Sequence, residues 1–489
     1  MKRFLKSSGV WVLLIGATLF VYFCHHRSRH SGEELGGGCG EGRVVGRGQD
    51  QNRHDGYAGE DHESASHVDA MHVHVGHEED NLGGHQSVPT PDRRNGGLLM
   101  TEVESYDAVI VGASFGGLAA AGQLDGAGRI LLVDREPVGV GETSACGTLL
   151  AVLERLDAGE ALEQVHPQVV INAAGRRAVF DTVRPFATFD YRTLSELLAG
   201  RLQNVEFTVA PFHGVERDGT LVLGNRRVRA QVVIDASGWR RVVACALGAP
   251  AVDREQLSTG VETRHRHGGC VLEFWFRPPE RPDGVYWAFP AGDHVREGSA
   301  SYLGRARGLR EDLARFEHVD AFPPKAVHGG WFPAHLGEPV VGNVFVVGDA
   351  AGQCLPLTGE GIRPALVFGQ AAGREARRAL EGTCDVDAAL ASYRANVERS
   401  RFAYRALEHS QSWALRTPLS VVAPLVKGCT WGPVSRRLQA AYWAAADPDS
   451  LEIAFAARSN TTLIGGQCAT GPAANSRGAV VDEEGATST

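Results

Sequence analysis

Apolar runs separated by glycine-rich turns dominate the chain from residue 106 onward. Residues 106–111 predict a buried strand, residues 118–124 a helix, and residues 129–134 a second buried strand. This order is that of a βαβ unit. Residues 231–235 predict another buried strand, and residues 344–347 predict a further one before a glycine turn and a helix. The pattern indicates an open α/β sheet of the Rossmann type.

Alternating apolar and polar positions with many aromatic residues mark a second region, residues 258–303. This pattern predicts an antiparallel sheet. Its strands are expected at residues 271–276, 284–290, 299–303 and 325–332. Further short antiparallel strands are expected at residues 205–209, 220–223 and 226–228. Helices are expected at residues 149–156, 190–198, 385–410 and 418–442.

The first hundred residues have a different composition. An apolar run follows three basic residues, so residues 1–24 predict an N-terminal membrane anchor or signal, with the uncleaved anchor favoured. Residues 25–103 are rich in Gly, His, Asp and Glu and predict a disordered linker. Ten of the 19 histidines lie between His25 and His85. We favour a solvated tether over loose metal affinity for this tract.

Met100 is one of three methionines in the chain, and it directly precedes the first predicted strand. The sequence around it resembles a natural N-terminus. We therefore expect residues 1–99 to be dispensable for folding. Membrane association through the N-terminus is expected for a product that retains these residues.

Composition narrows the classes of partner. The 489-residue chain is 43% hydrophobic, which is enough for a large buried core. Its net charge of −9, without a basic stripe interleaved with aromatics, argues against a nucleic-acid partner. Nine cysteines without CxxC pairs are typical of reduced thiols. We expect a cytoplasmic location or the cytoplasmic face of a membrane, and no metal site in the folded part.

The turn after the first strand carries a glycine fingerprint of dinucleotide binding. Gly112 permits a tight turn and Gly117 lets the helix approach the strand, while Ser114 stands where a glycine is usual. Asp134 lies 22 residues after Gly112 and suits ribose hydroxyls. The alternative is a doubly wound sheet without a ligand. The candidate cofactor-binding residues here are Gly112, Ser114, Gly116, Gly117, Asp134 and Arg135.

A second candidate cofactor segment is residues 344–362, in which a short strand turns at a glycine and leads into a helix. A carboxylate suits sugar hydroxyls, and a helix N-terminus suits a phosphate or a ring that becomes anionic on reduction. The alternative is an ordinary strand-turn-helix with an aspartate cap. The candidate residues are Gly348, Asp349, Gly359, Gly361 and Ile362.

Further candidates lie between these two segments. Asp235 ends a buried strand, and Arg192 suits a phosphate or cofactor edge, with a surface arginine as the alternative. Cys146 is a candidate catalytic thiol, with an inert buried cysteine as the alternative. An apolar wall, which is alternatively plain core, is predicted from three aromatic residues, Trp275, Trp287 and Phe289.

Four segments occur in one order, namely residues 112–134, 235–239, 284–290 and 348–362. With these motifs the chain resembles the geranylgeranyl reductase-like family of flavoproteins, within the wider para-hydroxybenzoate-hydroxylase-like FAD enzymes that include flavin-dependent halogenases. The resemblance covers roughly residues 104–380. The family's Tyr-x-Trp-x-Phe-Pro motif lines the prenyl cavity. In this chain Val285 stands at the tyrosine position, and a tyrosine follows one residue later.

The resemblance implies FAD as the cofactor. It places Trp287 and Phe289 at the substrate, and Cys146 only loosely echoes the cysteine-containing stretch of the reductases. The implied FAD contacts are Gly112 and Gly117 at the diphosphate, Asp134 at the adenosine ribose, Asp349 at the ribityl chain, and Gly359 and Gly361 at the flavin N1–C2 edge.

The expected fold is α/β, with a Rossmann-like FAD-binding domain, an antiparallel β-sheet substrate domain and C-terminal helices. The FAD-binding domain is expected to be discontinuous. The expected segments are residues 104–166, 187–252 and 340–380 for the FAD-binding domain, 167–186 and 253–339 for the substrate domain, and 381–489 for a C-terminal helical region with a loose tail.

The implied function is reduction of C=C bonds of an isoprenoid or other apolar substrate by hydride transfer from reduced flavin. The chain has no second dinucleotide fingerprint, so NAD(P)H is expected to bind transiently, or a redox partner protein supplies the electrons. One rival is a monooxygenase or halogenase acting on an aromatic or polyketide-like substrate. A halogenase needs a catalytic lysine, and the folded part has Lys325 and Lys427 alone. The other rival is a non-catalytic FAD- or lipid-binding protein.

Overall fold

The computed structural model describes residues 102–142, 145–266, 269–323 and 326–452. They all belong to the second of two units of the chain, Val75–Thr489. The expected anchor at residues 1–24, the linker as far as residue 101, the alternative start at Met100 and the tail from residue 453 lie outside the described residues.

The first sheet is a mixed sheet whose central strands run parallel. The strand order is β15-β16-β9-β1-β2-β6, and β7 and β8 extend from β9. Strands β16, β9, β1, β2 and β6 pair in parallel, which confirms the Rossmann-type α/β class. The bounds are β1 Val103–Val111, β2 Ile130–Asp134, β6 Val205–Val209, β7 Phe212–Val215, β8 Leu221–Leu223, β9 Arg226–Asp235, β15 Val340–Val341 and β16 Val344–Val346.

The prediction that residues 205–209 form an antiparallel strand is wrong, because β6 pairs in parallel with β2. The predicted strands 226–228 and 231–235 are one strand, β9, which pairs with β1 from Arg227 to Asp235 and whose first residues also pair with β8. Short apolar runs do not reveal the direction of pairing, and a polar interruption such as Arg229–Gln231 can lie inside a strand.

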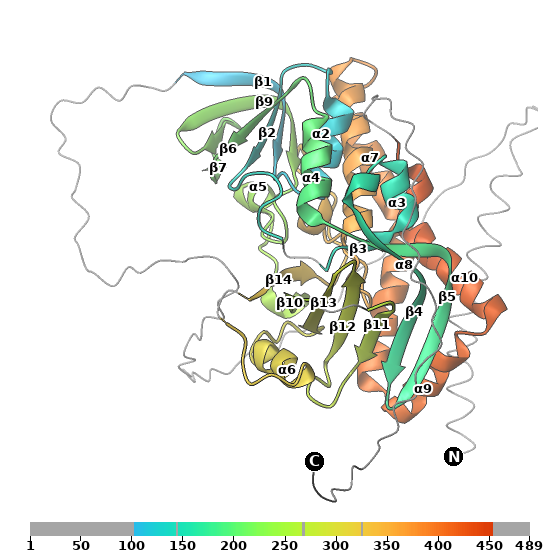
Figure 1. Cartoon of the computed structure of the whole chain (residues 1–489). Helices are drawn as coiled ribbons and strands as arrows, with labels where there is room; N and C mark the ends of the chain where they lie inside the picture. Colours follow the sequence, from blue (N-terminus) through green and yellow to red (C-terminus); the bar gives the residue numbers. More distant parts are fainter. Residues whose placement is uncertain (1–101, 143–144, 267–268, 324–325, 453–489) are drawn as a thin grey trace, which may run out of the picture. The chain divides into compact units, whose positions relative to one another are not determined.

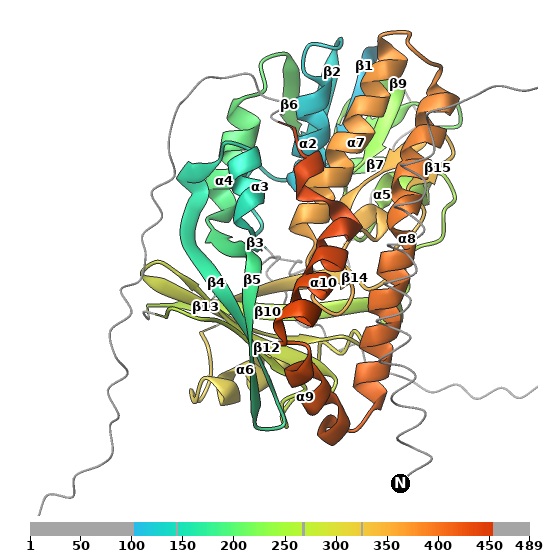
Figure 2. The ribbon, with the colours of Figure 1, turned by 90° about the vertical axis from the view of Figure 1, so that its right-hand side faces the viewer.

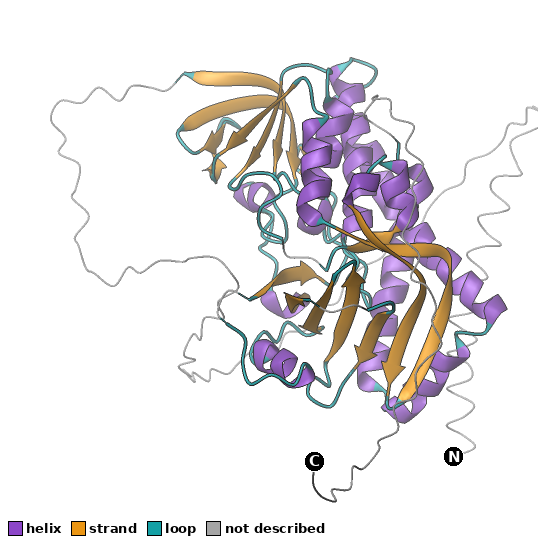
Figure 3. Cartoon of the chain, viewed as in Figure 1, coloured by secondary structure: helices purple, strands orange, loops and turns teal. Residues whose placement is uncertain are grey.

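Alternate residues of the first sheet contribute to two cores. Residues such as Ile110, Leu132 and Phe345 pack against the long helices. Residues such as Val109 and Val344 pack on the other face with α5. Figure 3 shows the helices gathered beside this sheet. The helices that contribute residues to these two cores include α2 Phe115–Leu124, α3 Leu150–Arg155, α4 Tyr191–Gly200, α5 Val242–Ala246 and α7 Ile362–Leu380.

The second sheet has the order β14-β10-β13-β12-β11-β4-β5-β3, and each pair of neighbours is antiparallel except β11 with β4. The α6 helix, Leu309–Phe316, packs on one face of it. The bounds are β3 Gly147–Leu149, β4 Leu162–Ala173, β5 Arg176–Phe189, β10 Leu257–His265, β11 Leu272–Phe276, β12 Gly284–Ala291, β13 His294–Ser301 and β14 Val327–Pro333.

The antiparallel strands expected between residues 258 and 332 are confirmed. The β4–β5 hairpin and α6 were not predicted as elements, and the expected domain boundary at residue 166 falls inside β4. The expected helix at residues 418–442 is two helices. Short 3-10 helices complete the described part: η1 Gly159–Ala161, η2 Arg254–Gln256, η3 Gly348–Ala351, η4 Ala444–Ala446 and η5 Pro448–Ser450.

The C-terminal helices are α8 Val386–Arg416, α9 Leu419–Gly428 and α10 Gly432–Trp443. The α8 helix runs along both sheets, as Figure 2 shows. The hydroxyl of Tyr393 donates to Val346 O of the first sheet at 2.8 Å. Near the other end, Arg277 Nη1, just after β11, donates to Ala414 O at 2.8 Å. This helix therefore fixes the two sheets to one another. Among the described residues, none of the helices has the length and apolar character needed to span a membrane.

The α2 and α7 helices approach each other backbone to backbone. A Cβ added at Gly369 of α7 would lie 2.3 Å from Gly116 O of α2, and one at Gly373 would lie 2.6 Å from Ala120 O. Such distances leave no room for a side chain. The glycines therefore allow the helix after the first glycine turn to lie directly against the helix after residue 361.

We expect Gly369→Ala to lower the free energy of unfolding by ~1–3 kcal/mol, because the new methyl group forces the two helices apart. Chemical denaturation measures this change. The matched control is Gly200→Ala, at the last residue of α4, where an added Cβ meets no atom within 4 Å. The control should be neutral or stabilising by about 0.4–1 kcal/mol. Equal effects of the two substitutions would contradict the close-packing account.

Candidate active site

The carboxyl ends of the neighbouring strands β16, β9, β1 and β2 bring the predicted cofactor residues to one edge of the first sheet. Gly112 has φ +110°, and a Cβ there would lie 2.2 Å from Ala236 O. A Cβ at Gly117 would lie 1.8 Å from Gly112 O. Both positions therefore require glycine, as the sequence predicted.

Asp134 ends β2 and stabilises this turn. Its Oδ2 accepts from the backbone N–H of Ala113 at 2.6 Å, and its Oδ1 accepts from the N–H of Glu136 at 3.1 Å. Ser114 is the N-cap residue of α2 but its side chain does not cap the helix; its Oγ lies 3.4 Å from the Tyr191 hydroxyl. The first N–H groups of α2 thus have no side-chain acceptor from Ser114, which leaves them for an anion.

The Asp235 side chain accepts hydrogen bonds from the turn that directly follows it. Its Oδ1 accepts from the N–H and hydroxyl of Ser237 at 3.1 and 2.6 Å, and its Oδ2 accepts from the N–H of Ala244 at 2.9 Å. The aspartate is fully buried, and burial raises the pKa of its carboxyl. Because this turn contains Ala236, which contacts Gly112, Asp235 serves the glycine turn by positioning it.

Two arginines were predicted near the cofactor. Arg135 directly follows Asp134 at the end of β2. Arg192 lies in the first turn of α4, where Asp190 caps the helix by accepting from Thr193 N at 2.8 Å. The Arg192 side chain is exposed and lies 3.6 Å from Glu196, so its cofactor role stays a prediction.

Asp349 lies in η3, immediately after β16. Gly348 has φ +61°, and its N–H donates to Gln353 Oε1 at 2.7 Å. Asp349 is mostly buried among protein atoms, and this desolvation raises the pKa of its carboxyl to about 6. A Cβ at Gly361 would lie 3.6 Å from Asp349 Oδ1. The carboxylate therefore lies beside Gly361, the N-cap residue of α7, which has no side-chain cap.

The loop before α7 is held at several points. Leu357 has φ +70°, its N–H donates to Gln411 Oε1 of α8 at 2.6 Å, and its carbonyl accepts from the Tyr302 hydroxyl at 2.8 Å. Gly359 also has a positive φ of +66° and lies against the ring of Phe332 on β14. The loop is thus fixed between α8 and the second sheet.

Glu360 and Arg363 form a buried network that the sequence reasoning missed. Arg363 is fully buried and its Nε and Nη2 donate to the two Glu360 oxygens at 2.7 and 2.8 Å. Tyr442 of α10 donates to Glu360 Oε2 at 2.5 Å, and Arg363 Nη1 donates to Trp443 O at 3.1 Å. The (i, i+3) spacing of the two charges at a helix start was the available signal.

The second sheet presents an aromatic face to this loop. Trp287 pairs with Phe274 across β12 and β11, and Phe274 contacts the Phe289 ring edge-on at 5.3 Å. By strand alternation Val285 shares their face, and Phe332 of β14 does as well. Because Phe332 contacts Gly359, the aromatic face and the end of the cofactor segment adjoin.

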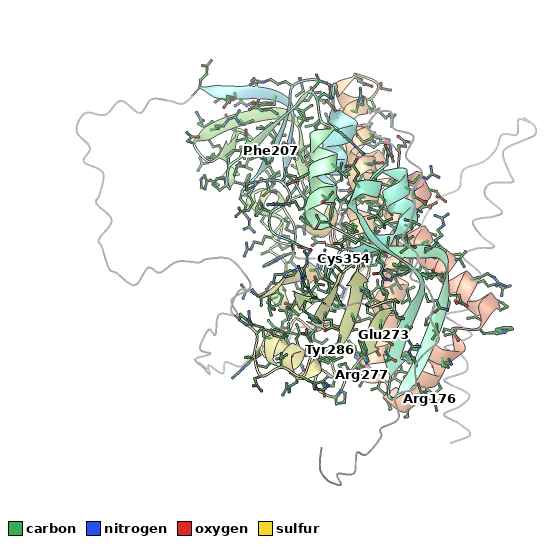
Figure 4. The ribbon with its side chains drawn as sticks, viewed as in Figure 1. Arg176, Phe207, Glu273, Arg277, Tyr286 and Cys354 are labelled. Atoms are coloured by element: carbon green, nitrogen blue, oxygen red, sulfur yellow. The ribbon has the colours of Figure 1, made fainter. Side chains whose placement is uncertain are left out.

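The prediction that Trp275 belongs to this wall is wrong. Trp275 alternates with Phe274 and packs against Phe316 of α6 at 4.9 Å, on the opposite face. Tyr286 also faces α6, where its hydroxyl donates to Asp312 O at 3.2 Å; Figure 4 labels it beside that helix. Val285 stands at the tyrosine position of the aromatic motif, and Tyr286 cannot take over the role of that tyrosine because its side chain lies on the opposite face of the sheet.

Trp287 lies over two glycines. A Cβ at Gly298 would lie 2.0 Å from Trp287 Cζ2, and one at Gly260 would lie 3.3 Å from Cη2. The indole N–H donates to Glu262 Oε2 at 2.9 Å. The glycines of the neighbouring strands β13 and β10 thus leave room for the indole ring to pack flat against the sheet, and the hydrogen bond to Glu262 fixes the orientation of the ring.

Cys146 and Arg296 lie beside the same face. The Cys146 thiol is fully buried and donates to Glu142 Oε1 at 3.2 Å, and burial raises its pKa well above the usual range. Arg296 is fully buried and binds Glu142 and, at 3.5 Å, Glu163. Burial alone would raise the pKa of Glu142, but Arg296 and Arg264 outweigh it and lower that pKa. Cys146 is therefore a neutral donor, and its catalytic role stays a prediction.

A second buried thiol, that of Cys354, lies next to Gly361; a Cβ at Gly361 would be 3.6 Å from its Sγ. Figure 4 labels Cys354 at the level where the two sheets meet. Burial raises the pKa of this thiol well above the usual range too. It contributes packing at the cofactor segment, and no local sequence pattern predicts its position.

The arrangement fits a dinucleotide that carries a flavin. Glycines at 112 and 117 leave space for close approach of a diphosphate, and two helix N-termini without side-chain caps supply N–H groups. Carboxylates at 134 and 349 suit the hydroxyls of the two sugar portions. The packing of α2 against α7 brings the two predicted cofactor segments, residues 112–134 and 344–362, to one site.

Comparisons with known proteins agree with this geometry. No family model matches the chain. The digeranylgeranylglycerophospholipid reductase of Methanocaldococcus jannaschii is 28% identical over 316 residues, covering 56% of this chain and 78% of the relative. The crystal structure of a geranylgeranyl bacteriochlorophyll reductase-like protein from Thermoplasma acidophilum matches with a TM-score of 0.63 and 19% identity, over 71% of this chain and 98% of that one.

A further structural match is PqsL from Pseudomonas aeruginosa, described as a probable FAD-dependent monooxygenase. Its TM-score is 0.52 at 18% identity, over 70% of this chain and 100% of that one. At these identities the structural matches establish the fold. Together with the site and the named reductases, they define the class: the chain is an FAD-dependent oxidoreductase. Within that class, the resemblance to the geranylgeranyl reductase-like flavoproteins is confirmed.

The raised pKa of Asp349 predicts a pH-dependent affinity for FAD. A hydroxyl of bound FAD would donate to the ionised carboxylate, so binding should favour loss of the proton and tighten as pH rises through about 6. We expect about tenfold tighter binding at pH 7 than at pH 5, measured by flavin fluorescence titration of the apoprotein. Asp349→Asn should bind more weakly and remove this pH dependence. An unchanged pH profile in the variant would contradict the assignment.

Proposed function

We propose that the protein reduces carbon–carbon double bonds of an isoprenoid chain. The observation that carries the proposal is the aromatic face formed by Phe274, Trp287 and Phe289 beside the loop that ends the cofactor segment. A branched hydrocarbon chain has no polar groups to bind, so an apolar face is the surface that recognises it. The names of the relatives, which are reductases of digeranylgeranyl lipids, support the same substrate class.

Each residue group has a defined task in this proposal. Bound FAD, once reduced, supplies a hydride for the double bond. The N-terminus of α7, at Gly361, favours negative charge on the adjoining cofactor edge by about 0.3–2 kcal/mol. Trp287, fixed by Glu262, holds the chain against the sheet and excludes water from the reacting carbon. Glu360, Arg363 and Tyr442 keep the loop in place.

The electron donor belongs to the proposal as well. The sequence contains no second dinucleotide fingerprint after Gly112–Asp134. We therefore propose that NAD(P)H binds transiently or that a redox partner protein delivers the electrons. Stopped-flow reduction of the FAD-loaded protein by NADPH separates the two. A rate that saturates with NADPH supports direct transfer, and no reduction supports a carrier protein.

We expect Trp287→Phe to lower kcat/KM for an isoprenoid substrate at least tenfold, since loss of ~1.4 kcal/mol of contact in the transition state is a factor of ten. The substitution removes the N–H bond to Glu262 and part of the wall. The matched control is Trp275→Phe, in the neighbouring strand but on the opposite face. The control should retain turnover, and both variants should retain FAD. Equal losses in the two variants would contradict the assigned face.

Anaerobic incubation with a geranylgeranyl lipid tests the function itself. The protein is loaded with FAD and reduced chemically, and mass spectrometry should detect addition of two hydrogens for each double bond reduced. Reduction must proceed without oxygen. Failure with every isoprenoid lipid, together with substrate-stimulated oxygen consumption with an aromatic compound, would favour the monooxygenase instead. The structural match to PqsL is the observation that favours a monooxygenase as the second candidate function.

A further inference from the structure

Three potential metal ligands meet on the other face of the second sheet, away from the aromatic wall. They are His265 at the end of β10, Glu297 on β13, and Glu317 directly after α6. One ligand atom from each lies within 4.8 Å of the others. The three come from separate elements that α6 packs together, so the sheet and helix fix their relative positions.

The two carboxylates approach different nitrogens of the imidazole. His265 Nε2 lies 3.3 Å from Glu297 Oε2, and His265 Nδ1 lies 3.5 Å from Glu317 Oε2, while one ligand atom of each residue lies within 4.8 Å of the other two. Metal–ligand bonds of 2.0–2.2 Å place neighbouring tetrahedral ligands about 3.4 Å apart. A small rotation of the imidazole is needed, because one nitrogen must bind while the other turns away.

The environment of Glu317 is an independent indication that a cation belongs at this position. Its side chain is only 7% exposed, and its Oε1 is buried without a hydrogen-bond partner. Among the described residues, its one ion pair is with His265. A buried carboxylate oxygen that has no hydrogen-bond partner is costly unless a cation lies beside it.

A second group, formed by Glu142, Glu262 and His328, is less suited to an ion. It lies by the aromatic face, where Arg296 and Arg264 already supply positive charge to the carboxylates. No arginine forms an ion pair with Glu317 in the described part of the chain. The sequence predicted no metal site in the folded part, because these ligands are far apart along the chain.

We propose that His265, Glu297 and Glu317 bind a divalent transition ion of the Zn²⁺ type, which ties α6 to strands β10 and β13. One imidazole and two carboxylates without a thiolate form a donor set that Zn²⁺ accepts. The remaining position is filled by water or a fourth oxygen ligand. This site is separate from the flavin and does not depend on the proposed substrate.

The test uses the full FAD-loaded chain and Zn²⁺ itself as the probe. Zinc added after chelation should raise the melting temperature of the wild type, because a ligand of the folded state stabilises it. We expect Glu317→Gln and His265→Gln to weaken zinc binding at least about tenfold and remove that rise. The matched control, His328→Gln, carries the same substitution on the opposite face of the sheet and should keep the response.

The histidine-rich N-terminal tract also offers zinc ligands, so metal content is compared between variants that all retain the tract. Wild type should hold one more tightly bound zinc per chain than Glu317→Gln, measured by elemental analysis after dialysis. Metal-free Glu317→Gln should melt no lower than metal-free wild type, since the amide replaces a buried carboxyl group whose Oε1 has no hydrogen-bond partner to lose. The proposal would be overturned if wild type showed no zinc response, or if Glu317→Gln and His265→Gln responded to zinc as strongly as wild type does. FAD content, which the site does not affect, reports separately on the flavin assignment.

Discussion

The close contact of α2 with α7 is the constraint on which the rest of the site depends. The two helices begin about 250 residues apart in the sequence, yet Gly116, Gly369 and Gly373 let their backbones touch. Their N-termini therefore lie at the same edge of the first sheet, beside the ends of β1 and β16. A side chain at Gly369 or Gly373 would separate the diphosphate end of the site from the sugar-alcohol end.

One loop, which precedes α7, connects the cofactor end of this helix pair to the second sheet. Residues 355–361 carry two positive φ angles and are fixed by Tyr302, Gln411 and Tyr442, which come from the second sheet and the C-terminal helices. The C-terminal helices thus stabilise the cofactor end of α7 as well as covering the core. Charged groups around Arg296 lie on the same face of the second sheet as the aromatic residues, so the mostly apolar wall borders a buried ionic network.

Much of this could be predicted from the sequence because local signals agree with the fold. Gly112, Gly117 and Asp134 are read from spacing, and the structure requires glycine at both glycine positions. Trp275 was misplaced because an aromatic run does not show where strand alternation begins until its partner strands are known. The Arg296 network, Tyr442 and the Glu317 group depend on contacts between distant segments, so no local pattern marks them. The direction of β6 was missed for the same reason.

The cofactor content of the purified full chain tests the central claim most directly. Flavin released by denaturation should be FAD, at one per chain, and the apoprotein should bind FAD much more tightly than FMN. FMN lacks the adenosine monophosphate half of FAD, and with it the diphosphate and the adenosine ribose that the Gly112 turn and Asp134 are positioned to hold. A colourless protein that takes up no FAD, or one that binds FMN equally well, would contradict the joint site between α2 and α7.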